Sequence, residues 1–351
     1  MKKNRIAFII IFLSVLFLPI ITFNYKGTVS EKENRNLQSR PKNFKEANNY
    51  ISDKFGFRNE FLKIYSYFPQ EKISGNVIYG KQGWLFYTAD GNLSDFCKRN
   101  ISLERAKKFA LNLKSMSDWC KENGIIFVAV VAPNKHSVYE EFYILNRPKG
   151  KTFMDYCAQE TEKLDINFIW ERDLIISAKK DYEFPLYYKT DTHWNSSGAK
   201  LYSEVLNKII ENNFPQITFP HIEYETQVQL NENSKHDIAN MLTTNKKFSD
   251  YEVSIKPKEK DFSSYYEYLK NEGINGVIIK GKNEKLPKAL IYRDSFFSAL
   301  EPFTSPMFSE AEYKWARLTK DKKEYILKNK PDILIFESVE RYAFSIADIE
   351  F

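Results

Sequence analysis

Two short stretches of the sequence, about one hundred residues apart, hold the side chains best suited to nucleophilic catalysis. In the first stretch Asp191 precedes His193 by two positions, so extended backbone would project both side chains to the same side. The carboxylate can then hold one ring nitrogen while the other faces a reactant. In the second stretch Ser295 follows a short apolar run and precedes a helix-like segment. A serine hydroxyl needs an oriented base to attack at neutral pH, so these residues predict a Ser-His-Asp triad.

Each residue of this set also has an ordinary structural explanation. An Asp-Ser pair at a helix start is commonly a cap, so we interpret Asp294 as a cap rather than as the acid of the triad. An isolated histidine is usually structural, and we place His136, His221 and His236 in that category. Catalysis at Ser295 is favoured by its place at a strand-to-helix turn, where side chains are exposed at the carboxyl edge of a sheet.

The chain around these residues alternates between helix and strand patterns. In residues 102–122 apolar side chains recur at steps of three and four, which predicts a helix that Gly124 ends. Residues 125–131 are apolar throughout, as in an interior strand of a parallel sheet. A helix over 152–164 and a strand over 166–170 are expected next. This alternation predicts an α/β sandwich with a mostly parallel sheet.

The two catalytic stretches fall at junctions of the same alternation. Asn195 or Ser196 can cap a helix that follows the histidine, and a strand over 289–292 leads to the serine. Residues 213–287 are interpreted as a β-rich insertion, either a substrate-side flap or a small β-subdomain. Further elements are expected as a helical face in 51–68, a hairpin over 77–86, a helix near 320–328 and a strand over 332–336.

Residues 1–24 are predicted to form a membrane anchor. A small cationic head precedes an uncharged apolar run over 6–23, about the shortest length that spans a bilayer. No Ala-x-Ala-like cleavage site follows, which favours an uncleaved anchor over a removed signal peptide. The positive-inside rule then places the rest of the chain outside the cytoplasm. Polar residues 25–50 are interpreted as a tether to a catalytic domain over 51–351.

The composition argues against several classes of function. With 351 residues that are 43% hydrophobic, the chain can bury a large core. The net charge of +6 is spread along the chain without a basic block, so nucleic acid is not an expected partner. Neither a glycine-rich phosphate loop nor a metal-ligand spacing occurs, and we expect no cofactor and no metal. Cys97 and Cys120 could form a disulfide outside the cytoplasm, and three buried thiols, with Cys157, fit the sequence equally well.

The catalytic stretches resemble those of a known family. Asp-Thr-His-Trp-Asn at 191–195 and Arg-Asp-Ser-Phe at 293–296 are similar to motifs of the alginate O-acetyltransferase family with an SGNH-hydrolase-like domain, the AlgJ/AlgX-like group close to the DHHW proteins. Comparable stretches lie at 76–86, 132–139 and 337–341, so the resemblance runs from about residue 55 to the C-terminus.

This resemblance implies a fold, a reaction and partners. The fold is an SGNH-hydrolase-like three-layer sandwich in circularly permuted order, since Ser295 follows His193 whereas ordinary SGNH hydrolases have their serine early. The reaction is O-acetylation of a cell-surface or secreted polysaccharide through an acetyl-serine intermediate. It takes place on the periplasmic or extracellular side of the membrane, with a membrane-bound O-acyltransferase as the partner that supplies acetyl groups.

Two other functions are consistent with the same residues. One is a carbohydrate acetylesterase with the same triad, which differs in whether water or a sugar hydroxyl reaches the acyl-enzyme. The other is a non-catalytic glycan-binding assembly subunit. The sequence leaves these alternatives open.

The oxyanion of the acyl transfer needs hydrogen-bond donors, and the backbone N–H of the serine is the natural first one. No second donor is identifiable. The residues considered for contacts with the oxyanion or the glycan are Lys135, Tyr139, Trp194, Arg293 and Arg341. For Trp194, packing beneath the histidine is favoured over stacking on a sugar.

Overall fold

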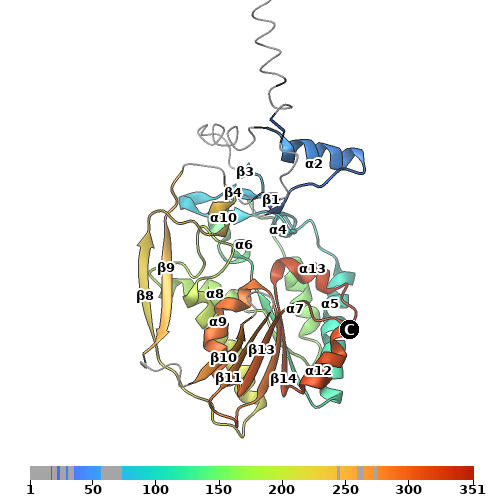
Figure 1. The fold of residues 1–351 in the computed structure, drawn as a ribbon, viewed down its shortest axis with the longest axis vertical. Coiled ribbons are helices and arrows are strands. Elements are labelled where there is room, and N and C mark those ends of the chain that lie inside the picture. The colour runs from blue at the N-terminus through green and yellow to red at the C-terminus, as the bar shows by residue number, and fades with distance from the viewer. Residues whose placement is uncertain are drawn as a thin grey trace, which may run out of the picture.

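A seven-stranded sheet lies at the centre of the protein in the computed structural model (Figure 1). The structure describes residues 17, 22–23, 29–30, 35–56, 73–242, 246–258, 265–271 and 276–351. The strands of the sheet are β6 (Ile126–Ala132), β7 (Asn167–Ile169), β10 (Tyr266–Asn271), β11 (Gly276–Gly281), β12 (Lys288–Arg293), β13 (Glu310–Trp315) and β14 (Ile333–Val339). Their order is β10-β11-β13-β12-β14-β6-β7. The five strands from β13 to β7 are parallel, and β11 and β10 are added antiparallel, which confirms the predicted α/β fold with a mostly parallel sheet.

Helices cover both faces of this sheet. One face packs against α5 (Leu103–Glu122), α7 (Phe153–Thr161), α12 (Lys323–Asn329) and α13 (Ala343–Ile346), which lie to the right in Figure 1. The opposite face packs against α8 (Arg172–Ala178), α9 (Ser196–Asn213) and α11 (Glu301–Thr304). In β6, Phe127 and Ala129 face the first layer while Val128 and Val130 face the second. Because side chains alternate along a strand, a strand between two helical layers is apolar on both faces.

The main predicted elements around the sheet are present. The Ser102 hydroxyl accepts the backbone N–H of Arg105 and caps α5, which ends before Gly124 as predicted. Asn195 caps α9 through its Oδ1, which accepts the N–H groups of Ser197 and Gly198. Strands 125–131, 166–170, 289–292 and 332–336 correspond to β6, β7, β12 and β14.

The helix-like segment expected after Ser295 consists of two separate turns. A 3-10 helix, η6 (Ser295–Ala299), begins at the serine itself, and α11 follows as a separate turn. Pro302 in the first turn of α11 has no N–H to donate, so one continuous α-helix cannot extend through this point. In the same way, the helix near 320–328 begins as a 3-10 turn, η8 (Lys320–Lys322), before α12.

Residues 213–287 contribute to two different sheets. Strands β8 (Tyr224–Asn231) and β9 (Asp250–Pro257) pair antiparallel over their full length and stand beside the sheet at the left of Figure 1. Strands β10 and β11 extend the central sheet instead. The connection between β8 and β9 carries a short helix, α10 (Asp237–Asn240). The proposed domain boundaries remain predictions.

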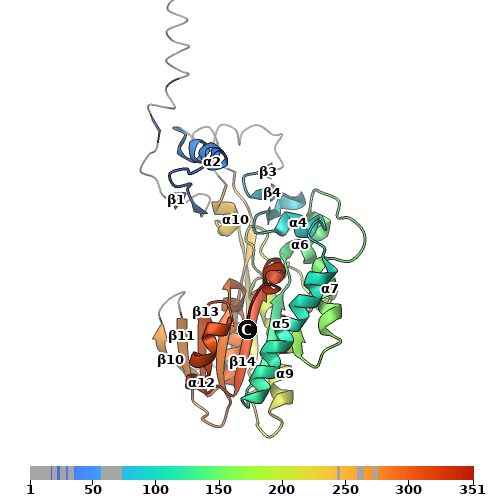
Figure 2. The ribbon, with the colours of Figure 1, turned by 90° about the vertical axis from the view of Figure 1, so that its right-hand side faces the viewer.

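A small sheet lies over the carboxyl edge of the central strands. It consists of β3 (Ile73–Ser74), β4 (Val77–Tyr79) and β5 (Leu85–Tyr87), and it includes the hairpin predicted over 77–86. Figure 2 shows this sheet beside α4 (Asn92–Phe96), α6 (Lys135–Val138) and α10. Because α6 directly follows β6, these elements mark the edge where parallel strands end.

The N-terminal predictions fall largely outside the described residues. The expected anchor over 6–23 is described only at residues 17 and 22–23, and most of the helical face in 51–68 lies in the undescribed segment 57–72. The helix α2 (Phe44–Lys54) begins within the segment interpreted as a tether. In the described part of the chain, no helix combines the length and the apolar character needed to cross a bilayer.

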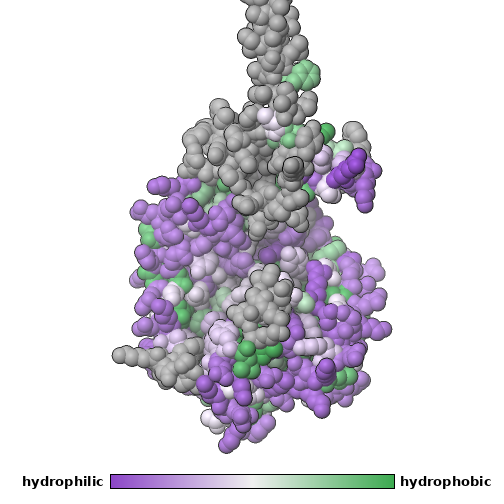
Figure 3. All heavy atoms as spheres, in the orientation of Figure 1, coloured by the Kyte–Doolittle hydropathy of each residue, from purple (hydrophilic) through white to green (hydrophobic). Residues whose placement is uncertain are grey.

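The three cysteines are unpaired, and the surface drawn in Figure 3 is mostly polar. Cys97, Cys120 and Cys157 are free thiols, and the latter two are buried residues of α5 and α7. Burial raises the pKa of Cys120 to about 12, which leaves an inert thiol at neutral pH. The face drawn in Figure 3 is mostly hydrophilic, with apolar residues in small separate groups.

Candidate functional site

Ser295 lies at the carboxyl edge of the sheet, where β12 meets η6. Asp294 shapes this turn with both oxygens of its carboxylate. Its Oδ1 accepts the backbone N–H of Phe296 at 2.9 Å, and its Oδ2 accepts that of Val339 at 2.7 Å. Asp294 is therefore a structural cap, as interpreted from the sequence, and it fixes the backbone that carries the serine.

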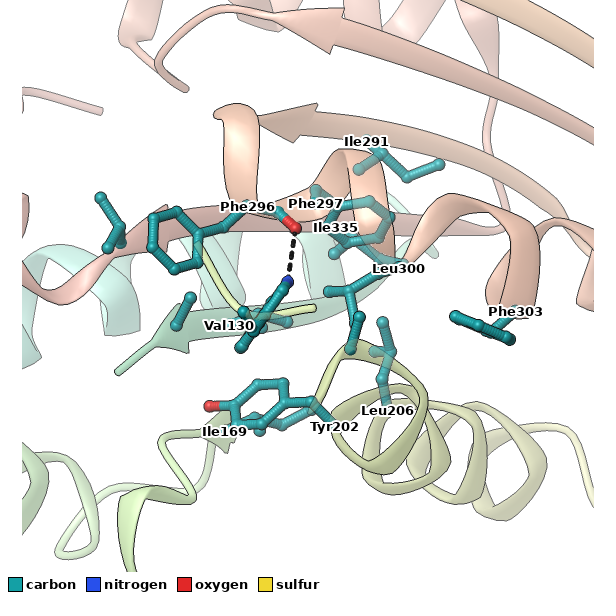
Figure 4. Close-up of a cluster of buried hydrophobic side chains, with 14 of the residues drawn as sticks. Val130, Ile169, Tyr202, Leu206, Ile291, Phe296, Phe297, Leu300, Phe303 and Ile335 are labelled. Atoms are coloured by element: carbon teal, nitrogen blue, oxygen red, sulfur yellow. Dashed lines mark hydrogen bonds between the residues drawn. The ribbon is translucent and has the colours of Figure 1, made fainter. Parts of the chain in front are cut away.

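Apolar packing holds the segment behind the serine. Phe296, Phe297 and Leu300 are buried, and Figure 4 shows Leu300 close to Leu206 of α9. The dashed line in that figure is the hydrogen bond from the Trp194 indole N–H to the Phe296 carbonyl, 3.1 Å long. This bond joins the residue after His193 to the residue after Ser295, so it helps to set the distance between the two catalytic stretches.

The structure brings the side chains of Asp191, His193 and Ser295 into one hydrogen-bonded line. Asp191 Oδ1 lies 2.6 Å from His193 Nδ1, and His193 Nε2 lies 2.7 Å from Ser295 Oγ. These distances suit a base that is oriented by a carboxylate and accepts the serine proton.

The backbone between the carboxylate and the histidine is a loop that directly precedes α9. Tyr187 and Trp194 form an isolated antiparallel bridge, and the Tyr188 N–H donates to the His193 carbonyl at 3.2 Å. The His193 N–H donates to Asp191 Oδ1 at 3.0 Å, so the carboxylate holds both the ring and the backbone of the histidine. A tight loop allows this double contact, because it folds the backbone amide back toward the carboxylate.

Opposing effects act on the Asp191 carboxyl group. Burial raises its pKa, but the hydrogen bonds and the charge of His193 outweigh burial and lower the pKa below its usual range. Asp191 is therefore ionised at neutral pH. An ionised acceptor at Nδ1 keeps the proton of a neutral imidazole on that nitrogen and leaves Nε2 free to act as a base.

The loop is supported by residues that the sequence interpretation did not select. Thr190 donates its N–H and its hydroxyl to Asp250 Oδ2, at 2.8 and 2.7 Å. Thr192 donates its N–H and its hydroxyl to the two oxygens of Asp237, at 2.9 and 2.7 Å. Both acids come from residues 232–250, so the β8–β9 connection and the start of β9 support the loop. No periodic pattern marks these residues, and only a three-dimensional contact reveals them.

Lys135 lies beneath the same loop and is buried. Its ammonium group donates to the backbone carbonyls of Tyr188, Lys189 and Asp191, at 3.1, 3.1 and 2.5 Å. Burial lowers its pKa to about 8, although nearby carboxylates, with Asp237 the strongest, favour the charged form. These contacts make Lys135 a support of the loop, and its contact with an oxyanion or a glycan stays a prediction.

Two of the selected aromatic residues are also structural. The Tyr139 hydroxyl accepts the backbone N–H of Leu186 at 2.8 Å, and its ring stacks on Trp84 with centroids 4.4 Å apart. Trp194 is 1% exposed and packs edge-to-face on Phe296, which agrees with the favoured packing interpretation.

The two selected arginines occupy different surroundings. Arg293 is buried, donates to the Asp294 carbonyl and the Ser298 hydroxyl, and lies over the ring of Trp315. Arg341 lies over the ring of Phe296, with its guanidinium carbon 5.4 Å from the centroid. Of the two, Arg341 is the one that lines a pocket beside the catalytic loop.

This pocket lies between the hairpin β4–β5 and the carboxyl edge of the sheet. Its lining residues are Phe86, Tyr87, Asn92, Asn134, Lys135, His136, Thr192, Ile238 and Arg341. The Asn134 side chain is 1% exposed, and neither of its amide atoms has a hydrogen-bond partner in the described part of the chain. The pocket is therefore polar, and it reaches Thr192, the neighbour of His193.

One group of ligand-type atoms occurs in the described residues. Asp191, His193 and Asp237 each place one such atom within 4.8 Å of the others. However, the short Asp191–His193 hydrogen bond occupies the ring nitrogen that would bind a metal ion.

Comparisons with known proteins agree with this fold. Bacillus cereus PatB1 with a sulfonyl adduct is 15% identical and superimposes with a TM-score of 0.57 over 79% of this chain and 100% of that chain. The O-acetyltransferase domain of Pseudomonas putida AlgJ is 17% identical, with a TM-score of 0.51 over 77% and 92%. A DHHW family protein from Eubacterium siraeum DSM 15702 is 14% identical, with a TM-score of 0.52 over 79% and 99%. These likenesses show a shared fold.

The sequence comparisons define the family. No curated protein matches the chain. The family described as the SGNH hydrolase-like domain of acetyltransferase AlgX matches residues 77–267, a stretch that includes Asp191 and His193 and ends before Ser295. That stretch is more than half of the 351 residues, so the chain belongs to the AlgX-type family of SGNH hydrolase-like acetyltransferase domains.

Proposed function

We propose that this protein is an O-acetyltransferase that acetylates hydroxyl groups of a cell-surface or secreted polysaccharide through an acetyl-serine on Ser295. The observation that carries the proposal is the line of hydrogen bonds from Asp191 through His193 to Ser295. Membership of an acetyltransferase family supports acyl transfer as the reaction class. The circularly permuted order of the catalytic residues is part of the same proposal.

In the first half-reaction, His193 Nε2 accepts the Ser295 proton as Oγ attacks the carbonyl carbon of an acetyl ester. The backbone N–H of Ser295 is at the first position of η6, where no intrahelical acceptor exists, and it can donate to the developing oxyanion. The intermediate collapses with breakage of the donor C–O bond, and His193 returns the proton to the leaving alcohol.

In the second half-reaction, a sugar hydroxyl takes the place of the leaving alcohol. His193 Nε2 removes its proton, the sugar oxygen attacks the acetyl-serine, and Ser295 Oγ leaves with the proton from His193. Asp191 stabilises the imidazolium in both halves.

The proposed location sets the source of acetyl groups. The apolar run over 6–23 would hold the chain in the membrane, with the catalytic domain on the periplasmic or extracellular side. Acetyl-CoA is a charged cytoplasmic molecule, so a transferase outside the membrane needs a partner that passes the acetyl group across. A membrane-bound O-acyltransferase fits this role.

The test uses the full chain in detergent with a chromogenic acetyl ester, with and without an oligosaccharide acceptor. Ser295→Ala and His193→Ala are compared with Ser177→Ala. This control also removes a serine hydroxyl, but from the exposed surface of α8. We expect acetylated sugar by mass spectrometry with wild type and Ser177→Ala, and a loss of at least roughly a thousandfold in turnover with the other two variants.

Each of the other functions has a distinct result in this assay. Release of chromophore without acetylated sugar, over a range of acceptors, would favour the acetylesterase. A wild-type protein as inert as Ser295→Ala, with retained glycan binding, would favour the non-catalytic assembly subunit.

A further inference from the structure

Asp237 is a second carboxylate beside the Asp191–His193 pair. Its Oδ1 accepts the Thr192 N–H at 2.9 Å, and its Oδ2 accepts the Thr192 hydroxyl at 2.7 Å. The same Oδ2 lies 3.9 Å from His193 Nδ1. In addition, the Asp237 N–H donates to Asp191 Oδ2 at 3.4 Å. One residue of α10 thus contacts every member of the Asp-Thr-His sequence.

We propose that Asp237 is a positioning residue of the acetyl-transfer site, which holds Thr192 in place and adds a second negative charge beside the histidine. This inference rests on the proposed function of Ser295 and His193. It assigns a role in turnover to the β8–β9 connection, which reaches the site at α10.

The electrostatics of the site argue for more than a structural role. Thr192 donates to both oxygens of Asp237, but an asparagine could accept the N–H and donate its amide to the Thr192 hydroxyl without a second charge. A carboxylate here lies close to Asp191, and burial and the Asp191 charge raise the pKa of Asp237. The position therefore carries an electrostatic cost, which a group used only for hydrogen bonds would avoid.

The added charge is useful when His193 becomes an imidazolium. At 3.9 Å from Nδ1, the Asp237 carboxylate is near enough to stabilise the positive ring during proton transfer. The other charged groups that face Asp237 are Asp191, which opposes its charge, and Lys135, whose ammonium lies under the loop. His236 and Asp250 pair with each other on the adjoining side of the loop. Lys135 offsets part of the repulsion between the two acids.

The test compares Asp237→Asn, which removes the charge and keeps the shape, with Asp237→Glu, which restores the charge. Glu252→Gln is the matched control, because this carboxylate of β9 contacts His236 and not His193. The readouts are kcat and KM of the full chain between pH 5 and pH 9 with the chromogenic ester, and the melting temperature of each variant.

We expect Asp237→Asn to lower kcat about tenfold with KM changed less than about twofold, since the charge acts on the transition state. The acidic limb of the rate profile should move to lower pH, because the loss of a nearby negative charge makes the protonated form of a base less favourable. Asp237→Glu should return the limb toward the wild-type position, and Glu252→Gln should leave kcat and the limb unchanged.

Thr192→Val separates the two parts of the role. It removes the hydroxyl that donates to Asp237 but keeps the charge, so kcat should fall without a shift of the acidic limb. An Asp237→Asn profile that matches Glu252→Gln would overturn the inference, and so would a lower melting temperature with unchanged kcat. A wild-type enzyme without turnover would instead contradict the proposed function itself.

Discussion

At the scale of single residues, the polar groups around His193 are nearly all held by more than one contact. Asp191 Oδ1 accepts both the ring and the backbone N–H of the histidine. Lys135 donates to three backbone carbonyls of the loop. Because each group has several partners, rotation of any one side chain would break several hydrogen bonds, and the site is pre-organised before substrate arrives.

A prediction at this scale concerns Lys135. Replacement by methionine keeps the length of the side chain but leaves three loop carbonyls without their donor and the nearby carboxylates without a cation. We expect the free energy of unfolding to fall by roughly 3–5 kcal/mol, as when one partner of a buried charge pair is removed. Urea denaturation at pH 7 measures this change.

The control for Lys135 is Lys208→Met on the exposed surface of α9, which should change stability little. If Lys135→Met were as stable as wild type and lost only substrate affinity, Lys135 would be a glycan contact after all.

At the scale of secondary-structure elements, the β8–β9 connection is the main support of the catalytic loop. Its Ile238 and Ala239 N–H groups both donate to the Thr190 carbonyl, at 3.1 Å each. Asp250, at the start of β9, accepts two hydrogen bonds from the same threonine. A segment interpreted from sequence as a flap or subdomain therefore stabilises the loop that carries the histidine.

The pH dependence of stability tests this support at Asp250. Burial raises the pKa of Asp250, but hydrogen bonds from His236 and Thr190 outweigh burial and hold the pKa below 3.8. A lowered pKa stabilises the fold above the unfolded-state pKa, and this stability is lost as the pH falls below about 4. Asp250→Asn should thus be about 2 kcal/mol less stable at pH 7, and the gap from wild type should narrow at pH 3.5.

Urea titrations at both pH values measure the free energy of unfolding of wild type and Asp250→Asn. Glu225→Gln on the exposed strand β8 is the control. If the difference in stability between wild type and Asp250→Asn stayed constant from pH 7 to pH 3.5, the charge of Asp250 would contribute nothing to stability.

Helix α9 yields a second prediction at this scale. Gly198 lies in its first turn, and a Cβ atom there would be 2.4 Å from the Leu186 carbonyl oxygen and 3.1 Å from the Trp194 Cβ. Gly198→Ala should therefore destabilise the protein by about 1–3 kcal/mol through overpacking, despite the better helix propensity of alanine. It should also lower turnover, because Leu186 and Trp194 flank the catalytic loop.

Calorimetry and the ester assay measure both effects. Lys208→Ala, on the exposed face of the same helix, reports propensity alone. A melting temperature of Gly198→Ala above that of wild type would show that the close approach to Leu186 costs nothing.

At the scale of the whole molecule, topology explains how distant residues meet. Ser295 follows β12, and Lys135 follows β6; both strands run parallel in one sheet with β14 between them. Parallel strands end at the same edge, so the residues after them converge there. The loop with Asp191 and His193 lies at this edge. The α10 segment contacts the loop in two ways: Asp237 accepts a hydrogen bond from it, and two backbone N–H groups of α10 donate to the Thr190 carbonyl.

The proposed membrane location gives a prediction for the entire chain. The full-length protein should sediment with membranes, and removal of residues 1–24 should release it, since the apolar run over 6–23 would be gone. Turnover of a soluble acetyl ester should remain within about twofold, because the site is built from residues beyond 130 and the anchor contributes no catalytic group. A truncated protein that still sediments with membranes, after a high-salt wash, would argue against the anchor.

The sequence alone determined the α/β class and the main helices and strands, and it predicted that Asp191, His193 and Ser295 act together. These features depend on local periodicity, on caps such as Asn195, and on residue types at short spacing. The placement of Asp294 as a cap was also predicted, because it depends on its own neighbours.

The tertiary structure decided which residues support the site. The hydrogen bonds of Asp237 and Asp250 join segments 45 and 60 residues apart, and no local pattern marks them. Burial decided the roles of Lys135 and Tyr139, whose polar atoms bind backbone groups that only the folded chain places nearby. Spacing along the chain predicts contacts within an element, whereas contacts between loops depend on how the whole sheet arranges its edge.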